Sequence, residues 1–173
     1  MARILIVGGG CLGRRLTAEL IQSGHAVRAT TRTEARRGAI EGSGAECWIG
    51  TPDRLATLRG ALENVTIACW LLAGVTGAQA QVRALHGSRL ELFLSQAIDT
   101  TVRGVVYDAA SATVAPEVLK QGERIVRALG RRNAIPIAVL TADPGDPAGW
   151  LASARGAVDG LLLGGSAGSP SSP

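Results

Sequence analysis

Three glycines near the start of the chain have the spacing of a phosphate-binding turn. Gly8, Gly10 and Gly13 form the pattern G-x-G-x-x-G between an apolar run at residues 3–7 and an expected helix at 12–23. The first glycine permits a tight turn, the second lets the backbone approach a pyrophosphate, and the third lets the helix pack closely on the strand. Free N–H groups at the helix start also favour phosphate. The placement predicts a nucleotide site; a turn that only shapes the fold is the alternative.

The residues after the expected second strand indicate which nucleotide binds. A site for NAD usually has Asp or Glu there, which hydrogen-bonds the ribose 2′-hydroxyl. This chain has Thr31 and Arg32 instead, and Arg32 is suited to charge-assisted contacts with a 2′-phosphate. Arg14, just after the third glycine, is placed to approach the same group. We therefore expect NADP(H), with NAD as the second possibility. The alternative for these arginines, and the expectation for Arg36 and Arg37, is a solvated helix surface.

The remaining cofactor contacts follow from the topology of parallel sheets. Ligands lie outside the carboxyl ends of the strands, where the strand order reverses. The loop after the third strand should lie near the adenine, and the loop after the fourth near the ribose and the nicotinamide. The expected cofactor-binding residues are Gly8, Gly10, Cys11, Leu12, Gly13, Arg14, Thr31, Arg32, Gly50, Thr51, Leu72, Ala73 and Gly74. For the glycines of the two later loops, ordinary turn chemistry is an equal alternative.

Residues suited to metal binding or acid–base chemistry are few. Three cysteines without C-x-x-C spacing and two separated histidines predict neither a disulfide framework nor a metal site. His86 is expected at a surface or an interface. The acids of the segment 143–147 (DPGDP) are expected to form a turn followed by a helix cap.

Strands and helices alternate along almost the whole chain. Strands are expected at 3–7, 26–30, 45–49, 66–72, 104–108 and 135–140, and helices at 12–23, 33–41, 52–62, 78–98, 116–131 and 146–163. Gly87 is a weak point inside the longest helix, and Thr33 is the expected N-cap of the second. This alternation predicts an α/β fold: one doubly wound parallel sheet in three αβα layers, with strand order 3-2-1-4-5-6. Residues 1–163 would form the single Rossmann domain and residues 164–173 a flexible tail.

Composition narrows the class of protein further. Of the 173 residues, 46% are hydrophobic and 18% are charged, which fits a folded domain better than a nucleic-acid-coating chain. The longest uncharged stretch, residues 64–82, is interrupted by Gly and Gln and predicts no membrane span. The apolar run at the N-terminus is too short for a signal peptide, so a cytoplasmic location is expected. Seven of the 17 arginines fall in the first 37 residues, where they suit an anionic small ligand, although codon bias also explains the high Arg content.

Three segments resemble the short-chain dehydrogenase/reductase superfamily, above all its atypical and extended, NAD-dependent epimerase/dehydratase-like branches. They are GGGCLGRRL after the first strand, TTR after the second, and VRGVVYDAAS around the fifth. The resemblance covers roughly residues 2–142 and implies NAD(P) binding with oxidoreductase or epimerase chemistry on an unknown small-molecule substrate.

The chain departs from that family at the catalytic pair. Active members use Tyr-x-x-x-Lys, but the only tyrosine and the only lysine here, Tyr107 and Lys120, are 13 residues apart. Tyr107 is expected to pack within the fifth strand. Ser111 stands near the position of the family's catalytic Ser or Thr, and an ordinary turn hydroxyl is the main alternative for it. The competing interpretation is therefore a regulatory or scaffold module that senses the nicotinamide cofactor and binds a protein partner.

The same family often forms dimers through the two long helices that flank the fifth strand. The helix at 78–98 has more apolar positions than one sheet-facing stripe requires. Val82, Leu85, Leu92 and Phe93 form one stripe, and Leu90, Leu94 and Ile98 begin a second. An exposed second stripe predicts a homodimer, unless a neighbouring helix covers it.

Overall fold

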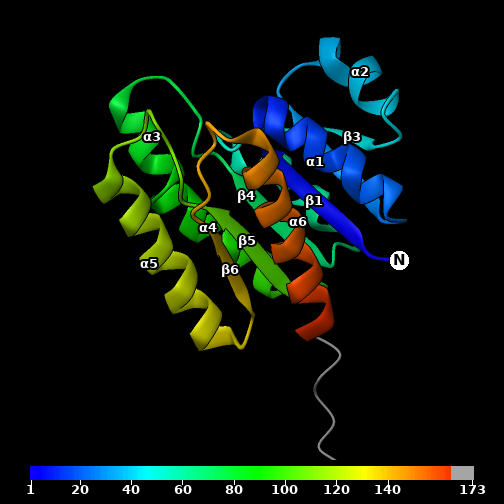
Figure 1. Cartoon of the computed structure of the whole chain (residues 1–173). Helices are drawn as coiled ribbons and strands as arrows, with labels where there is room; N and C mark the ends of the chain where they lie inside the picture. Colours follow the sequence, from blue (N-terminus) through cyan, green and yellow to red (C-terminus); the bar gives the residue numbers. More distant parts are fainter. Residues whose placement is uncertain (165–173) are drawn as a thin grey trace, which may run out of the picture.

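The computed structural model describes residues 1–164 as a three-layer α/β unit (Figure 1). The strands are β1 (Arg3–Gly8), β2 (Ala26–Thr31), β3 (Glu46–Ile49), β4 (Ile67–Leu71), β5 (Gly104–Asp108) and β6 (Ile137–Leu140). The α-helices are α1 (Gly10–Gln22), α2 (Arg37–Glu41), α3 (Gln79–Leu85), α4 (Ser88–Ile98), α5 (Pro116–Asn133) and α6 (Pro147–Gly164). All paired strands are parallel, in the order β3-β2-β1-β4-β5-β6, which confirms the predicted fold class and strand order.

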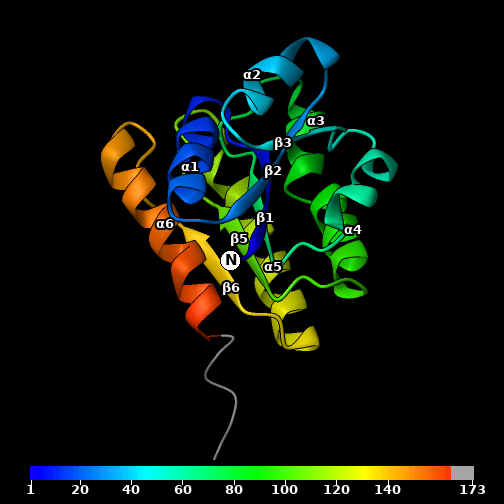
Figure 2. The ribbon, with the colours of Figure 1, turned by 90° about the vertical axis from the view of Figure 1, so that its right-hand side faces the viewer.

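The central strands are buried on both faces, as their continuous apolar sequences require. In β1, Ile4 and Ile6 belong to one core cluster with residues of α1 and α6. Leu5 and Val7 point the other way, into a second cluster with residues of α4 and α5. Figure 2 shows the sheet between these two layers of helices. This arrangement leaves the carboxyl edge of the sheet free for a ligand.

The prediction of a helix at residues 52–62 is wrong. The segment instead forms two short 3₁₀ turns, Leu55–Leu58 and Gly60–Leu62. Local contacts override the helical pattern: Thr57 Oγ1 accepts a hydrogen bond from the Thr51 N–H at 2.9 Å, and Gly60 lies so close to Trp48 that a Cβ there would be 2.9 Å from the indole ring. The helix expected at 33–41 is likewise replaced by a 3₁₀ turn, Glu34–Arg36, followed by the short α2, and Thr33 makes no side-chain cap.

The single helix expected at 78–98 is divided into α3 and α4 at its predicted weak point, Gly87. A Cβ at Gly87 would lie 3.0 Å from the Arg83 carbonyl oxygen, so the close turn there favours glycine. His86, just before the break, is completely buried. Its expected surface position is therefore wrong.

The second apolar stripe of this region is covered within the protomer. Leu90 and Leu94 are buried, at 0% and 4% exposure, and belong to the core cluster shared with α5. Leu92, assigned to the buried stripe, is instead 51% exposed. The assignment of the two stripes was wrong because the break at Gly87 changes the phase of α4 relative to α3. The apolar argument for a homodimer through Leu90 and Leu94 therefore does not hold.

The expected turn and cap before the last helix are confirmed. Asp143 accepts a hydrogen bond from the Gly145 N–H at 2.8 Å, and Asp146 accepts one from the Gly149 N–H at 3.2 Å, at the start of α6. Residue 164, expected in the tail, closes α6, and residues 165–173 lie outside the described part of the chain. Within residues 1–164, no helix combines the length and apolar character that crossing a bilayer requires.

Candidate functional site

A cleft of about 940 Å³ opens at the carboxyl edge of the sheet. Its walls come from the β1–α1 turn, the ends of β2, β4 and β5, the segment after β5 and the start of α6. In Figure 1 this is the upper end of the sheet, where α1 begins. The cleft therefore lies at the switch point of the strand order, where open α/β sheets bind ligands.

The glycine turn forms the floor of the cleft with an unusual backbone. Gly8, Gly9 and Gly10 have φ values of 83°, 86° and 51°, in the left-handed region that favours glycine. A Cβ on Gly13 would lie 2.7 Å from the Gly8 carbonyl oxygen, so the expected close packing of helix on strand is confirmed. A Cβ on Gly10 would meet nothing within 4 Å. The turn thus leaves open space in front of Gly10, beside the N-terminus of α1, which fits the pyrophosphate of a dinucleotide.

Three arginines line the cleft: Arg14, Arg32 and Arg36. Arg32 is 61% exposed in its side chain and pairs with Asp53 at 3.3 Å. Arg14 donates a hydrogen bond to Cys11 Sγ at 3.0 Å. Arg36 was expected to be only a solvated surface residue; it is exposed but also contributes to the cleft. Arg32 and Arg36 place positive charge at the end of the cleft beyond β2, and Arg14 adds positive charge from the first turns of α1.

Twelve of the fourteen predicted site residues line this cleft: Gly8, Gly10, Cys11, Leu12, Gly13, Arg14, Thr31, Arg32, Gly50, Leu72, Gly74 and Ser111. Two do not. Ala73 is completely buried in a small apolar cluster with Val114 and Leu119, because the chain turns inward after β4. Thr51 is occupied by hydrogen bonds with Thr57, which hold the loop after β3.

Glycine at position 50 has a packing reason as well as a place in the cleft. A Cβ there would lie 2.8 Å from the Thr57 carbonyl oxygen. Gly74 has no such constraint, since a Cβ added there would meet nothing within 4 Å.

The Ser111 hydroxyl is engaged in a local turn. Its Oγ accepts hydrogen bonds from the N–H groups of Thr113 and Val114, at 3.0 and 2.9 Å. The hydroxyl therefore stabilises the segment before α5, as the alternative interpretation expected, although Ser111 also lines the cleft.

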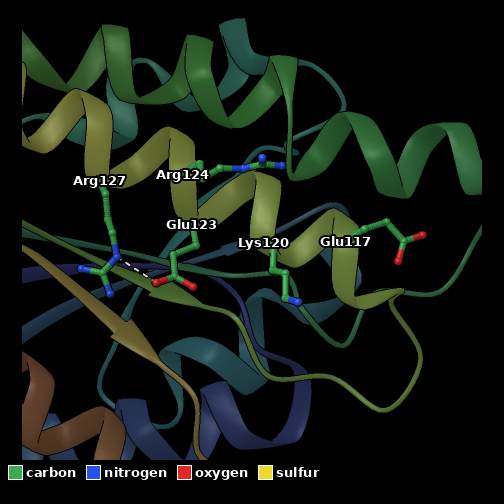
Figure 3. Close-up of a pocket in the computed structure, with 5 residues that line it drawn as sticks. All are labelled: Glu117, Lys120, Glu123, Arg124 and Arg127. Carbon is green, nitrogen blue, oxygen red and sulfur yellow. Dashed lines mark hydrogen bonds and ion pairs between the residues drawn. The ribbon is translucent and has the colours of Figure 1, made fainter.

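Neither Tyr107 nor Lys120 lines the cleft, and the two side chains lie in different environments. Tyr107 is completely buried, as expected, and its hydroxyl lies 2.7 Å from His86 Nδ1. Burial raises the pKa of Tyr107 and lowers the pKa of His86, so both groups are neutral at pH 7. Lys120 is exposed on the outer face of α5 (Figure 3). No Tyr–Lys catalytic pair forms among these residues.

The outer face of α5 also has a shallow hollow of about 360 Å³. Its walls are charged side chains of this one helix: Glu117, Lys120, Glu123, Arg124 and Arg127 (Figure 3). Glu123 and Arg127 form an ion pair at 2.8 Å. Ion pairs of this kind on an exposed helix face contribute little free energy and do not by themselves form a binding site.

Sequence reasoning missed the acid in the cleft, Asp108. This residue ends β5, is 6% exposed and lines the cleft beside Trp150. Burial raises the pKa of Asp108 to about 6, while the Ala110 N–H and the nearby Trp150 indole act in the opposite direction. The available signal was an acid at the carboxyl end of an otherwise apolar strand, a position that faces the ligand edge of a parallel sheet.

The described part of the chain contains no cluster of side chains suited to a metal ion. Within residues 1–164, no three His, Cys, Asp or Glu side chains gather in a way that would hold an ion.

Comparison with known proteins shows which proteins this chain is similar to. No family model matches the chain. A ketoreductase from Stigmatella aurantiaca, which acts on a 4-hydroxy-2-methyl-3-oxo-4-farnesyl-3,4-dihydroquinoline-1-oxide, is 28% identical over 117 residues. That match covers 65% of this chain but 35% of the ketoreductase, so the chain spans about a third of its relative's length.

Two solved structures illustrate the structural similarity. A protein from Bacillus halodurans, assigned as an NAD-dependent epimerase/dehydratase, superimposes with a TM-score of 0.68 at 16% identity, over 83% of this chain and 71% of that one. A short-chain dehydrogenase/reductase superfamily protein from Agrobacterium tumefaciens with bound NAD gives a TM-score of 0.66 at 21% identity, over 80% and 48%. The chain therefore has the Rossmann-type fold of the short-chain dehydrogenase/reductase and epimerase/dehydratase proteins that it resembles.

Proposed function

We propose that this protein binds a nicotinamide dinucleotide in the cleft and belongs with the oxidoreductase- and epimerase-like members of the short-chain dehydrogenase/reductase superfamily. The observation that carries the proposal is the left-handed turn Gly8–Gly9–Gly10, with open space at Gly10 and the start of α1 beside it. Bound there, the nicotinamide would supply hydride transfer. The chain would hold the pyrophosphate with backbone N–H groups and the adenine half with the cleft wall near Gly50.

Within this proposal, NADP(H) is preferred over NAD(H). Arg32 is exposed at the end of β2, and Arg14 and Arg36 line the same cleft. The Arg32–Asp53 ion pair is mostly solvated and therefore weak, so a 2′-phosphate dianion would compete with it effectively.

Two observations favour a second candidate, a cofactor-binding protein without turnover. Tyr107 is buried against His86, and Lys120 faces solvent on α5, so neither is available to a substrate in the cleft. In this alternative the protein would report the state of the cofactor pool to a partner.

Calorimetric titration with NADPH and NADH tests the shared part of both candidates. The proposal predicts saturable binding of one equivalent, tighter for NADPH, and a rise in melting temperature with cofactor concentration. Absence of binding to either dinucleotide would overturn it. Consumption of NADPH with a panel of ketones and aldehydes then separates an oxidoreductase from a protein that binds without turnover.

A homodimer and a cytoplasmic location stay predictions from the sequence. The homodimer now rests on the family resemblance, because Leu90 and Leu94 are buried within one protomer. Light scattering decides it: a mass of twice 17.7 kDa supports the dimer, and a mass of 17.7 kDa rejects it.

A further inference from the structure

The end of the cleft opposite Arg32 and Arg36 contains a single acid, Asp108. Among the cleft-lining residues, the ionisable side chains are Cys11, Arg14, Arg32, Arg36 and Asp108. The arginines come from α1 and from the segment around β2, whereas Asp108 ends β5, on the other side of β1 in the sheet. In a doubly wound sheet with a dinucleotide in the cleft, the adenine half lies over β2 and the nicotinamide half over β4 and β5. Asp108 therefore lies on the nicotinamide side.

A second polar group, the Trp150 indole, lies beside Asp108. Trp150, in the first turn of α6, is 1% exposed and lines the cleft beside Asp108. Its indole N–H makes no close hydrogen bond within residues 1–164, but it lies near enough to Asp108 to lower the pKa of that carboxyl group. Asp108 itself accepts a hydrogen bond from the Ala110 N–H at 3.2 Å, and a carboxylate with two oxygens has acceptor capacity left for a ligand.

We propose that Asp108, supported by Trp150, makes the cleft selective for the oxidised form of the dinucleotide, because its carboxylate faces the positively charged nicotinamide ring of NADP⁺. The reduced ring of NADPH is neutral and gains nothing from this charge. This inference rests on the proposed function, since it requires the dinucleotide to occupy the cleft. It assigns Asp108 a role in binding only.

Burial makes this charge interaction effective. A nearly buried carboxylate loses much of its hydration, and a cation placed beside it restores part of the lost stabilisation. Because the pKa of Asp108 is raised to about 6, the group is charged at pH 8 and mostly neutral at pH 5. Selectivity for the oxidised ring should therefore decrease as the pH falls through this range.

Other charged groups around Asp108 are already engaged or belong to the other end of the cleft. They are Arg14 and Cys11 on α1, which bond each other, Asp143 and Asp146 before α6, which accept backbone N–H bonds, and Arg32 and Arg36 beyond β2. On β5 itself, Tyr107 points into the opposite core cluster and bonds His86. Burial has the largest effect on the pKa of Asp108 and raises it, whereas the N–H groups of Ala110 and Trp150 lower it.

Asp108→Asn is the main test variant, because Asn keeps an oxygen that can accept the Ala110 N–H. Asp99→Asn is the matched control, since Asp99 is an exposed acid at the C-terminus of α4, outside the cleft. At pH 8, we expect the ratio of the NADPH to the NADP⁺ dissociation constant to fall about tenfold or more in Asp108→Asn and to stay unchanged in Asp99→Asn. An unchanged ratio in Asp108→Asn would overturn the inference.

A fragment without nicotinamide separates this inference from the proposed function. 2′-Phospho-ADP-ribose carries the same phosphates but no nicotinamide, so any titration of the 2′-phosphate cancels in a ratio of affinities. In the native protein, the affinity for NADP⁺ relative to this fragment should rise about fivefold from pH 5 to pH 8, and in Asp108→Asn it should be flat. If neither NADP⁺ nor the fragment binds, the proposed function fails. If both bind and the ratio is flat in the native protein, only the role of Asp108 fails.

Trp150→Phe gives an independent check on the pair. Removing the indole N–H removes a group that lowers the pKa of Asp108, so the rise in relative NADP⁺ affinity should move to higher pH. A rise at the native pH in a variant that still binds the fragment would show that Trp150 does not support Asp108.

Discussion

The arginines of this chain differ in what their guanidinium groups already contact. Arg28 is 4% exposed, pairs with Glu46 at 3.0 Å and lies over the Trp48 ring, so it stabilises the β2–β3 edge. Arg37 pairs with Glu34 and Glu41. Arg32 has one exposed partner, Asp53, and lines the cleft. The side-chain contacts therefore distinguish structural arginines from those that are available to a phosphate. The clustering of arginines in the sequence does not make this distinction.

Replacing Arg32 should change the choice of cofactor. In Arg32→Ala we expect the affinity for NADPH to fall about tenfold and the affinity for NADH to stay within about twofold, because only NADPH has the 2′-phosphate. Arg37→Ala is the matched control, since Arg37 pairs outside the cleft-lining set. Calorimetry of both cofactors measures the effect. Equal losses for NADPH and NADH would show that Arg32 does not contact the 2′-phosphate.

The buried Asp108 should make stability depend on pH in a defined direction. Its pKa is about 6 in the folded protein against an ordinary value of 3.8, so the folded state binds more protons between these values. Stability contributed by this group therefore falls as the pH rises through about 4 to 6. Asp108→Asn should be more stable than the native protein at pH 8, by up to about 3 kcal/mol, and should lose this advantage near pH 4. Thermal unfolding at the two pH values checks it, and the opposite order would contradict the burial argument.

Removing the Tyr107 hydroxyl should weaken the fold and leave binding intact. In Tyr107→Phe, His86 Nδ1 loses its partner at 2.7 Å inside the core. We expect the free energy of unfolding to fall by about 1–3 kcal/mol, with unchanged NADPH affinity and no loss of any turnover that is found. Urea unfolding and cofactor titration measure the two effects. Complete loss of turnover with normal folding and binding would place Tyr107 in the reaction.

At the level of elements, the sequence was sufficient for the sheet but not for its connections. The apolar runs of β1, β4 and β5 are buried on both faces, so composition alone locates them. The structure of segment 52–62 could not be predicted from its hydrophobic pattern. Its 3₁₀ turns depend on the contact of Gly60 with the Trp48 ring and on the hydrogen bond between Thr51 and Thr57, which that pattern does not reveal. The break at Gly87 was anticipated as a weak point, but the burial of His86 depends on Tyr107, 21 residues away.

Two helical glycines give a test of how α5 packs on the sheet. A Cβ at Gly122 on α5 would lie 1.9 Å from the Tyr107 hydroxyl oxygen, whereas a Cβ at Gly156 on α6 would meet nothing within 4 Å. Gly122→Ala should therefore destabilise the protein by about 2 kcal/mol or more. Gly156→Ala should stabilise it by about 0.5–1 kcal/mol, through helix propensity. Thermal unfolding of the pair measures both, and a neutral Gly122→Ala would contradict the close contact of α5 with β5.

At the level of the whole molecule, the strand order alone determines where the cleft lies, at the carboxyl edge of the sheet. The place of the glycine turn and of Arg32 in the cleft was predictable, because motif and topology agree on one edge of the sheet. Asp108 and Arg36 were missed, because their place in the cleft depends on where β5 ends and on how the segment before α2 turns. Ala73 and Thr51, which were also expected at the site, do not line the cleft, because Ala73 packs into an apolar cluster and Thr51 bonds Thr57.

A dinucleotide bound in the cleft should lie against the turn at Gly10, and two matched valine variants test this placement. Gly10 and Gly24 both have positive φ values, 51° and 85°, and a Cβ on either would meet nothing within 4 Å. Valine at either position therefore introduces backbone strain while its Cβ meets no neighbouring atom, but only Gly10 lines the cleft. NADPH is titrated into the native protein, Gly10→Val and Gly24→Val, with folding verified for each. We expect the NADPH affinity of Gly10→Val to fall by about a hundredfold or more and that of Gly24→Val to stay normal. Normal NADPH affinity in a folded Gly10→Val would show that no dinucleotide lies against this turn.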